Sequence, residues 1–337
     1  MTLRFVNGAL LITLIVILLS GVYGIVWTLD GWMYEVHRIG SWALIALIPW
    51  KVGISWASLK RGFAFNITRG LVPIVSLLLS GLVIFVILLG LGWAWRIGPV
   101  VLWLYETVIS WHWILALASI PFFLLHVWQR WPKIKQRDLL SRSGFLKLSA
   151  LGAVGVVGWW LSQMWAVLRQ DEDMPRSVSG SRLNGYFSGN QFPVTTGYGD
   201  GRQAVDLDSW QLSIGGAVAQ PFALTYPDIL SLTSSSQVAT IDCTIGWYSV
   251  QRWGGLRMVD LLQLAGSQDD IQQVRIQAVS GYTKTYPMVE AKDILLATHV
   301  GGEVLNHSHG FPLRAVVPSR RGWFWVKWVE IVTAIVQ

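Results

Sequence analysis

The sequence is poor in cysteine, in charged residues and in histidine. Its 337 residues include one cysteine, Cys243, so no disulfide can form within the chain, and neither an oxidising nor a reducing compartment is implied. Charged residues make up 13% and hydrophobic residues 53%, a balance that excludes an ordinary soluble protein. The net charge of +7 comes without a motif that combines basic and aromatic residues, so no nucleic-acid partner is expected.

The apolar residues lie mostly in the first half of the chain. Five runs are long enough to cross roughly 30 Å of hydrocarbon, at residues 8–28, 35–56, 71–95, 110–129 and 146–166. The first run lacks a convincing small-residue cleavage site, so it is expected to remain as a membrane helix rather than be removed as a signal peptide. The protein is therefore expected to cross a lipid membrane several times.

Basic residues flank these runs unevenly and predict the orientation in a bacterial cytoplasmic membrane. Most of them lie in the connections after the second and fourth runs, which places the N-terminus in the cytoplasm and residues 170–337 outside it. These residues are Lys60, Arg61, Arg69, Arg130, Lys133, Lys135, Arg137, Arg142 and Lys147.

Three of the six histidines lie in the apolar runs. His37 opens the second run, and His112 and His126 stand 14 residues apart in the fourth. Fourteen residues of α-helix return to within about 40° of the same face and rise about 21 Å. The residue 14 positions after His37 is Lys51. Both runs cross in the same direction, so His37 is expected to lie level with His112, and Lys51 with His126.

This spacing resembles the di-haem membrane cytochromes b, whose paired helices each carry two haem ligands; Lys51 stands where that family has histidine. The resemblance implies two b-type haems, an outer one on His37 and His112 and an inner one on His126 and Lys51. The alternative is that the histidines are interfacial polar residues and that Lys51 is an anchor whose ammonium reaches the membrane surface.

The fifth run follows the segment Ser-Arg-Ser-Gly-Phe-Leu-Lys at residues 141–147. It resembles a twin-arginine export signal with Ser143 in place of the second arginine, although a basic flank of a membrane helix is the alternative. The polar residues 169–185 predict a tether. The expected division is a four-helix membrane domain at 1–140, a joining segment at 141–184 and an extracytoplasmic domain at 185–337.

Cys243 follows a β-branched stretch, residues 237–242, that predicts a strand, and it precedes a glycine-rich segment that ends it. A lone cysteine at such a strand end can be an inert buried residue, a nucleophile or a thiolate ligand of a soft metal. Further strands are predicted near 210–216, 274–279, 316–317 and 325–336, and short helices near 227–232 and 259–265.

Two blocks of residues resemble the molybdenum-cofactor domain of the sulfite oxidase family, which includes periplasmic methionine-sulfoxide reductase catalytic subunits. The first block holds Cys243, Trp247, Trp253-Gly254-Gly255 and Asp260-Leu261-Leu262. The second holds His309-Gly310-Phe311-Pro312-Leu313-Arg314, Pro318-Ser319-Arg320-Arg321-Gly322 and Lys327-Trp328. The resemblance covers about 185–337. It implies an α+β fold with mixed sheets and Cys243 as the thiolate ligand of molybdenum.

Basic residues and a glycine of the second block suit a pterin phosphate, because cations and close backbone N–H groups bind phosphate. The residues that the resemblance and this chemistry assign to the cofactor are Asn190, Phe192, Cys243, His309, Arg314, Ser319, Arg320, Arg321, Gly322 and Lys327. Tyr248, Arg252 and Tyr282 are candidate catalytic residues of the pocket. Two alternatives remain: a zinc pair of His307 and His309 on one face of a strand, and Arg320-Arg321 as a solvated surface.

The predicted fold is an all-α five-helix transmembrane bundle followed by an α+β sulfite-oxidase-like molybdopterin domain. The predicted function is that of a molybdenum oxidoreductase passing electrons between the quinone pool, two haems and the molybdenum site. A fused haem domain favours reduction of a small S- or N-oxide. The alternatives are a sulfite-type dehydrogenase delivering electrons to quinone, a non-catalytic haem protein whose outer domain is a docking module, and a transporter. The runs hold few charged residues for a transporter.

Overall fold

The computed structural model describes residues 3–26, 31–64, 71–131, 135, 138–139, 141–168, 176–194, 205–268 and 270–336. The chain forms two compact units, and the boundary between them falls after Gly180. The second unit therefore begins at Ser181 rather than at the predicted residue 185. Arg69, Lys133, Arg137 and residues 169–175, on which the predicted orientation and tether partly depend, lie outside the described residues.

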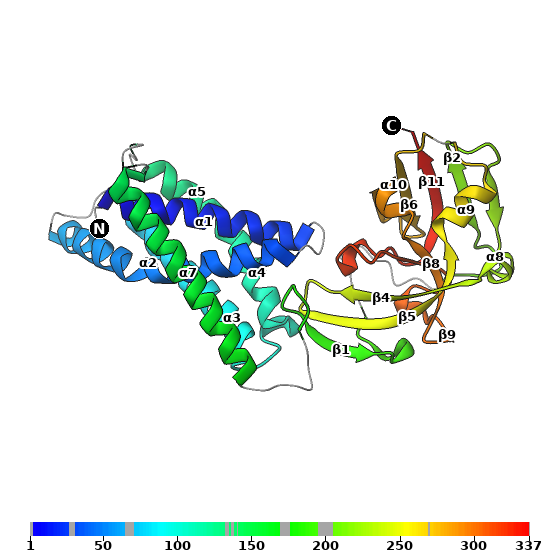
Figure 1. Cartoon of the computed structure of the whole chain (residues 1–337), viewed down its shortest axis with the longest axis horizontal. Coiled ribbons are helices and arrows are strands. Elements are labelled where there is room, and N and C mark those ends of the chain that lie inside the picture. Colours follow the sequence, from blue (N-terminus) through cyan, green and yellow to red (C-terminus); the bar gives the residue numbers. More distant parts are fainter. Residues whose placement is uncertain are drawn as a thin grey trace. The chain divides into compact units, whose positions relative to one another are not determined.

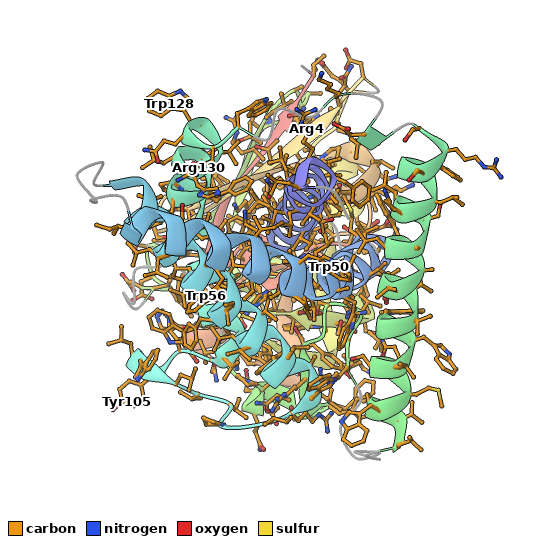
Figure 2. All side chains as sticks on the ribbon, turned by 90° about the vertical axis from the view of Figure 1, so that its left-hand side faces the viewer. Arg4, Trp50, Trp56, Tyr105, Trp128 and Arg130 are labelled. Carbon is orange, nitrogen blue, oxygen red and sulfur yellow. The ribbon has the colours of Figure 1, made fainter. Side chains whose placement is uncertain are left out.

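The first unit consists of long apolar helices. Five segments are long and apolar enough to cross a membrane, at Leu3–Val26, Gly31–Trp56, Ile74–Trp95, Val108–Gln129 and Arg142–Leu168, which confirms the five predicted runs and identifies a multi-pass membrane protein. Exposed aromatic side chains point outward from this unit, among them Trp50, Trp56, Tyr105 and Trp128 (Figure 2). The helices are α1 (Leu3–Val26), α2 (Gly31–Ala64), α3 (Leu71–Trp95), α4 (Val108–Ala118), α5 (Ile120–Gln129) and α7 (Arg142–Leu168).

The helices of this unit pack in two groups. Helix α2 packs against both α1 and α7, which crosses them (Figure 1), and α3 packs against α4 and α5. Gly155 allows the close approach of α7 to α2, because a Cβ there would lie 2.7 Å from the carbonyl oxygen of Ile39. The fourth crossing is interrupted at Ser119, with a proline at the start of α5, and α2 contains Pro49, so neither is an uninterrupted ideal helix.

The residues after α7 are held against the first unit rather than forming a loose tether. Trp93 donates its indole N–H to the carbonyl oxygen of Gly180 (3.0 Å), and Arg176 donates to the carbonyl oxygen of Trp93 (2.8 Å). Arg38 donates to the carbonyl oxygen of Val178 (2.7 Å). The tether prediction is wrong for these residues and for 182–186, which form a strand.

The second unit has two mixed sheets, as predicted for an α+β domain (Figure 1). The six-stranded sheet has the order β1 (Arg182–Tyr186), β5 (Trp247–Arg257), β8 (Leu295–Val300) and β10 (Arg314–Val316), with β4 (Ser235–Asp242) on β5 and β9 (Glu303–Val304) on β8. The five-stranded sheet has the order β3 (Phe222–Leu224), β2 (Leu212–Gly216), β11 (Val329–Ile335), β6 (Gln273–Ala278) and β7 (Thr283–Pro287). Two pairs are parallel, β1 with β5 and β2 with β11.

Short helices and turns connect these strands. They are α8 (Tyr226–Leu232), α9 (Met258–Leu264), α10 (Met288–Ala291) and the 3-10 turns η1 (Trp103–Tyr105, in the first unit), η2 (Gly189–Gln191), η3 (His307–His309) and η4 (Gly322–Phe324). The predicted helices at 227–232 and 259–265 and strands at 237–242 and 274–279 are confirmed within a few residues. The strand predicted from 325 begins only at Val329.

Candidate functional site

Cys243 lies in the tight turn between β4 and β5, where the sequence predicts it. Its N–H donates to the carbonyl oxygen of Trp247 (2.8 Å), and its own carbonyl oxygen accepts from Gly246 (3.0 Å), which has a φ of 95° that suits glycine. Burial raises the pKa of the thiol to about 11, while the positive charges of Arg321 and Arg314 act in the opposite direction. The thiol is therefore protonated at neutral pH, and a metal would bind it by displacing that proton.

A buried ion pair adjoins Cys243. Asp242 is fully buried, and its Oδ1 accepts hydrogen bonds from Arg321 Nη1 (2.6 Å) and from the hydroxyl of Ser181 (2.7 Å). Arg321 is almost fully buried too, and its Nε has no hydrogen-bond partner in the described part of the chain. The structure thus brings Arg321 beside the turn that carries Cys243, with one N–H left to bind an acceptor.

His309 presents an open acceptor within the same domain. Its ring stacks on Phe192 with centroids 3.9 Å apart, and its Nε2–H donates to the carbonyl oxygen of Asn190 (3.0 Å). Burial, then the charges of Arg314 and Lys327, lower the pKa of His309 to about 4, so the ring is neutral and Nδ1 carries a lone pair. Nδ1 is buried and finds no partner among the described residues, which fits a ligand that donates an N–H there.

Asn190 acts on this site through its backbone. Its side-chain Nδ2 donates to Glu303 Oε2 (3.1 Å) and to the carbonyl oxygen of Val304 (2.9 Å), and its Oδ1 accepts from the N–H of Asn306 (3.0 Å). These bonds hold the Asn190 carbonyl oxygen that receives the His309 proton. Asn190 is therefore placed to fix the tautomer of His309 rather than to offer its amide to a ligand.

Two further cations are buried near His309. Arg314 is fully buried, donates from Nη1 to the carbonyl oxygen of His309 (2.7 Å), and lies between the rings of Trp253 and Trp325, at 5.7 and 5.8 Å from their centroids. Lys327 is also almost fully buried. Buried cations are costly without an anionic partner, so their presence suits a phosphate group.

The adjacent basic residues Arg320 and Arg321 face different partners. Arg320 donates two hydrogen bonds to the carboxylate of Glu290, both 2.8 Å long, and Ser319 donates to the same carboxylate (3.4 Å). Arg320 is thus neutralised by the protein, and the solvated-surface reading does not hold for either arginine, since both are largely buried. Gly322, at the start of η4, is buried beside Arg321.

The three candidate catalytic residues are not brought together. Tyr248 pairs with Asp242 across the β4–β5 ladder, is mostly buried, and has a pKa raised by burial and by the Asp242 charge. Arg252 lies further along β5 and is exposed. Tyr282 precedes β7 in the other sheet and donates its hydroxyl to the carbonyl oxygen of Trp323 (2.6 Å). Only Tyr248 therefore adjoins the Cys243 turn.

Residues that the sequence did not single out form a buried polar group on β5. Gln251 Nε2 donates to the hydroxyls of Ser188 (2.9 Å) and Ser249 (2.8 Å), and its buried Oε1 has no partner in the described chain. Gln251 and Ser249 alternate with Trp247 and Trp253, whose rings contact Phe192. Polar residues at the inward-facing positions of a strand are the signal that could have identified them.

In the first unit, His37 and His112 meet as their spacing predicts. Their ring centroids are 6.2 Å apart, with planes inclined at 81°. His37 Nδ1 lies 3.0 Å from the carbonyl oxygen of Ile17, and His112 Nδ1 lies 2.8 Å from that of Val86. These bonds assign the proton of each ring to Nδ1 and leave Nε2 as the nitrogen able to bind a metal.

The second predicted pair is arranged differently. Lys51 Nζ donates to Asn7 Oδ1 (3.3 Å) on α1, and His126 Nδ1 hydrogen-bonds to the hydroxyl of Ser76 (2.9 Å) on α3. Both side chains are held by other helices.

The zinc alternative depended on a strand that is not formed. His307–His309 is a 3-10 turn, in which His307 stacks on Trp328 with centroids 5.2 Å apart while His309 stacks on Phe192. Within the described residues, no group of three or more His, Cys, Asp or Glu side chains could hold a metal ion.

Comparisons with known proteins concern less than half of the chain. The family profile described as "Oxidoreductase molybdopterin binding domain" matches residues 199–337. The uncharacterized oxidoreductase YuiH of Bacillus subtilis is 32% identical over 145 residues, which cover 41% of this chain and 73% of that protein. The putative protein-methionine-sulfoxide reductase subunit YedZ1 of Azospira oryzae is 27% identical over 142 residues, 41% of this chain and 54% of that protein.

More distant similarities extend to enzymes of other kinds. The sulfite oxidase of Arabidopsis thaliana is 28% identical over 169 residues, which cover 39% of this chain and 43% of that one. Among solved structures, the sulfane dehydrogenase SoxCD of Paracoccus pantotrophus aligns with a TM-score of 0.39 and 24% identity over 41% of each chain. The chain thus spans about half the length of two of these three sequence relatives.

Proposed function

Since the chain belongs to the oxidoreductase molybdopterin-binding family, we propose that it links a molybdenum site to the quinone pool through b-type haems held by its own helices. The protein is a molybdopterin-dependent oxidoreductase, and its first unit has the helices of a membrane protein. The haems, the quinone, the substrate and the individual site residues are the parts of the proposal that go further.

The cofactor site consists of residues from both sequence blocks. Cys243 supplies the thiolate ligand, His309 Nδ1 and Gln251 Oε1 accept pterin N–H groups, and Arg321 with Lys327 binds the phosphate. A molybdenum pterin, when bound, supplies two-electron chemistry with transfer of an oxygen atom. The buried acceptors and cations without a full set of protein partners support this assignment.

The observation that carries the haem proposal is the His37–His112 pair. Two imidazole–metal bonds of about 2.0–2.1 Å each, plus about 1.1 Å from each Nε2 to its ring centre, span about 6 Å. The centroid separation is 6.2 Å, and each Nδ1 is fixed by a backbone carbonyl oxygen, as is usual for metal-ligating histidine. Lys51 and His126 would hold the inner haem after leaving Asn7 and Ser76.

The proposed reaction is reduction of an S- or N-oxide by quinol. Oxidation of one quinol to quinone releases two electrons and two protons. The haems carry the electrons singly, and the substrate oxide takes up two electrons and two protons to give the reduced compound and water. The similarity to a putative methionine-sulfoxide reductase subunit and the haem ligands on the same chain support this direction.

The second candidate is oxidation of sulfite with delivery of electrons to quinone, which the similarity to plant sulfite oxidase favours. One experiment separates the two directions. The purified chain is reduced with dithionite and mixed with methionine sulfoxide or an N-oxide, and the oxidised chain is mixed with sulfite, while the haem absorption is followed. Haem reoxidation by an oxide supports the proposal, and haem reduction by sulfite supports the alternative. No response to any of them would favour a non-catalytic haem protein.

The catalytic unit is proposed to lie outside the cytoplasm. Basic residues gather at the end of the helices where α1 begins: Lys147 Nζ lies 5.6 Å from the ring of Phe5, Lys51 contacts Asn7, and Arg4 and Arg130 lie on the side shown in Figure 2. Protease added to intact spheroplasts should remove the second unit. Cleavage only in inverted vesicles would reverse the orientation.

A further inference from the structure

One face of β7 grips the turn that follows Arg321. Tyr282, Lys284 and Tyr286 alternate along the chain, so their side chains point to the same side of the sheet. Tyr282 donates its hydroxyl to the carbonyl oxygen of Trp323 (2.6 Å), and Tyr286 donates to that of Phe324. Two neighbouring carbonyl groups of η4 are thus held by two tyrosines.

Between the two tyrosines, Lys284 holds the side chains of the same turn. Its ammonium lies 4.2 Å from the ring centroid of Trp323 and 4.7 Å from that of Phe324, within the range of a cation–π interaction. It also lies 5.1 Å from the ring centroid of Tyr282. Burial raises the pKa of Tyr286, so its hydroxyl remains a donor at neutral pH.

The segment after β7 holds the other side of the basic stretch. Glu290 of α10 accepts two hydrogen bonds from Arg320, and the indole N–H of Trp325 donates to the Arg320 carbonyl oxygen (3.1 Å). With Arg320 fixed in this way, Arg321 turns towards Asp242 and the Cys243 turn. Residues 282–290 therefore set the direction of the basic stretch from both sides of Arg321.

We infer that Tyr282, Lys284 and Tyr286 are positioning residues that hold η4 in the conformation in which Arg321 and the Gly322 backbone meet the cofactor phosphate. The inference rests on the proposed assignment of that stretch to the phosphate. Tyr282 then acts through Trp323 and not as a catalytic residue, because its hydroxyl donor is already engaged by the backbone. Removing the grip should loosen the turn and weaken cofactor retention without touching the cofactor's own ligands.

The test uses four variants of the full chain. Lys284→Met removes the charge, Lys284→Arg keeps a cation that can stack on aromatic rings, and Tyr286→Phe removes one donor. Thr285→Ala, on the opposite and exposed face of β7, is the matched control. Hydrogen exchange is measured first in cofactor-free protein, at the amides of Phe324 and Trp325, which are bonded to carbonyl oxygens of Arg321 and Gly322. Retained molybdenum is then measured during dialysis of the loaded protein.

Lys284→Met and Tyr286→Phe should raise exchange at the two amides by at least about fivefold and shorten molybdenum retention by a similar factor. Lys284→Arg and Thr285→Ala should behave as the wild type, and exchange in β11 should stay unchanged in all four variants. Wild-type exchange in Lys284→Met and Tyr286→Phe would overturn the grip. Raised exchange with wild-type retention would overturn its role in cofactor binding. A wild-type chain that binds no molybdenum would instead contradict the proposed function, and the inference with it.

Discussion

The ring of His37 on α2 stands nearly perpendicular to the ring of His112 on α4, at 81°, with each Nδ1 fixed to a carbonyl oxygen of a different helix. Gly90 makes room for this arrangement, since a Cβ there would lie 2.9 Å from His112 Cε1. The ring orientations are therefore set by the helices rather than left to a ligand. An iron held between two imidazoles in perpendicular planes gives a highly anisotropic low-spin electron-spin signal.

Replacement of His112 by Ala should remove the haem with that anisotropic signal, because the iron loses one of its two nitrogen ligands. His126→Ala should remove the other haem, and Lys51→Met should alter only the second spectrum. Absorption and electron-spin spectra of the purified variants measure this, with His299→Ala in the second unit as the control. If His112→Ala leaves both spectra unchanged, the outer site is wrong; if Lys51→Met changes nothing, only the lysine assignment fails.

Cys243→Ser should abolish substrate turnover and leave the haem spectrum intact. Serine has a similar size, so the turn between β4 and β5 should still form, but a hydroxyl is a far poorer ligand than a thiolate for a soft metal. Turnover with an artificial electron donor and molybdenum content are the measurements, and Thr244→Ser is the neighbouring control. Wild-type turnover in Cys243→Ser would remove Cys243 from the site.

Much of the fold follows from local pattern. Apolar runs of 20 residues or more predicted the five membrane helices, and β-branched residues ending at glycines predicted β4 and the Cys243 turn. The 3-10 turn at His307–His309 was missed because it depends on a cap, in which Asn306 Oδ1 accepts from the N–H of His309 (2.8 Å). Strand β1 was missed because its polar residues become a strand only by pairing with the distant β5.

The division of labour within the site also depended on distant partners. Arg320 and Arg321 are neighbours of the same type, and nothing local distinguishes them. The structure gives Arg320 to Glu290 and Arg321 to Asp242, which lies 79 residues away. Asp242, Gln251 and Glu303 were not predicted for the same reason, since each gains its role from a residue that only folding brings near.

Arg321→Met should destabilise the second unit by about 3–5 kcal/mol, because it leaves the buried Asp242 carboxylate without its countercharge. The double variant Asp242→Asn with Arg321→Met should recover most of that loss, since no uncompensated charge then remains buried. Calorimetric melting of the cofactor-free full chain measures both effects. A double variant no more stable than Arg321→Met would contradict this account of the pair.

The cofactor-free protein should lose stability as the pH falls from about 6.5 towards 4, in part through His309. Its pKa is lowered by burial from the 6.5 usual for histidine to about 4 in the folded protein. Between these values the unfolded chain binds a proton that the folded chain does not, so acid favours unfolding. The melting temperature of His309→Gln should fall less steeply over this range than that of the wild type. Parallel curves would contradict a buried neutral His309.

The most direct measurement is the molybdenum and haem content of one purified preparation of the chain, by elemental analysis and by the pyridine haemochrome spectrum. The account predicts one molybdenum and two haems per chain, with the haem retained in Cys243→Ser and the molybdenum retained in His112→Ala. One haem per chain would contradict the inner site on Lys51 and His126. A chain that binds molybdenum but no haem, or haem but no molybdenum, would contradict the central claim that one polypeptide carries both centres.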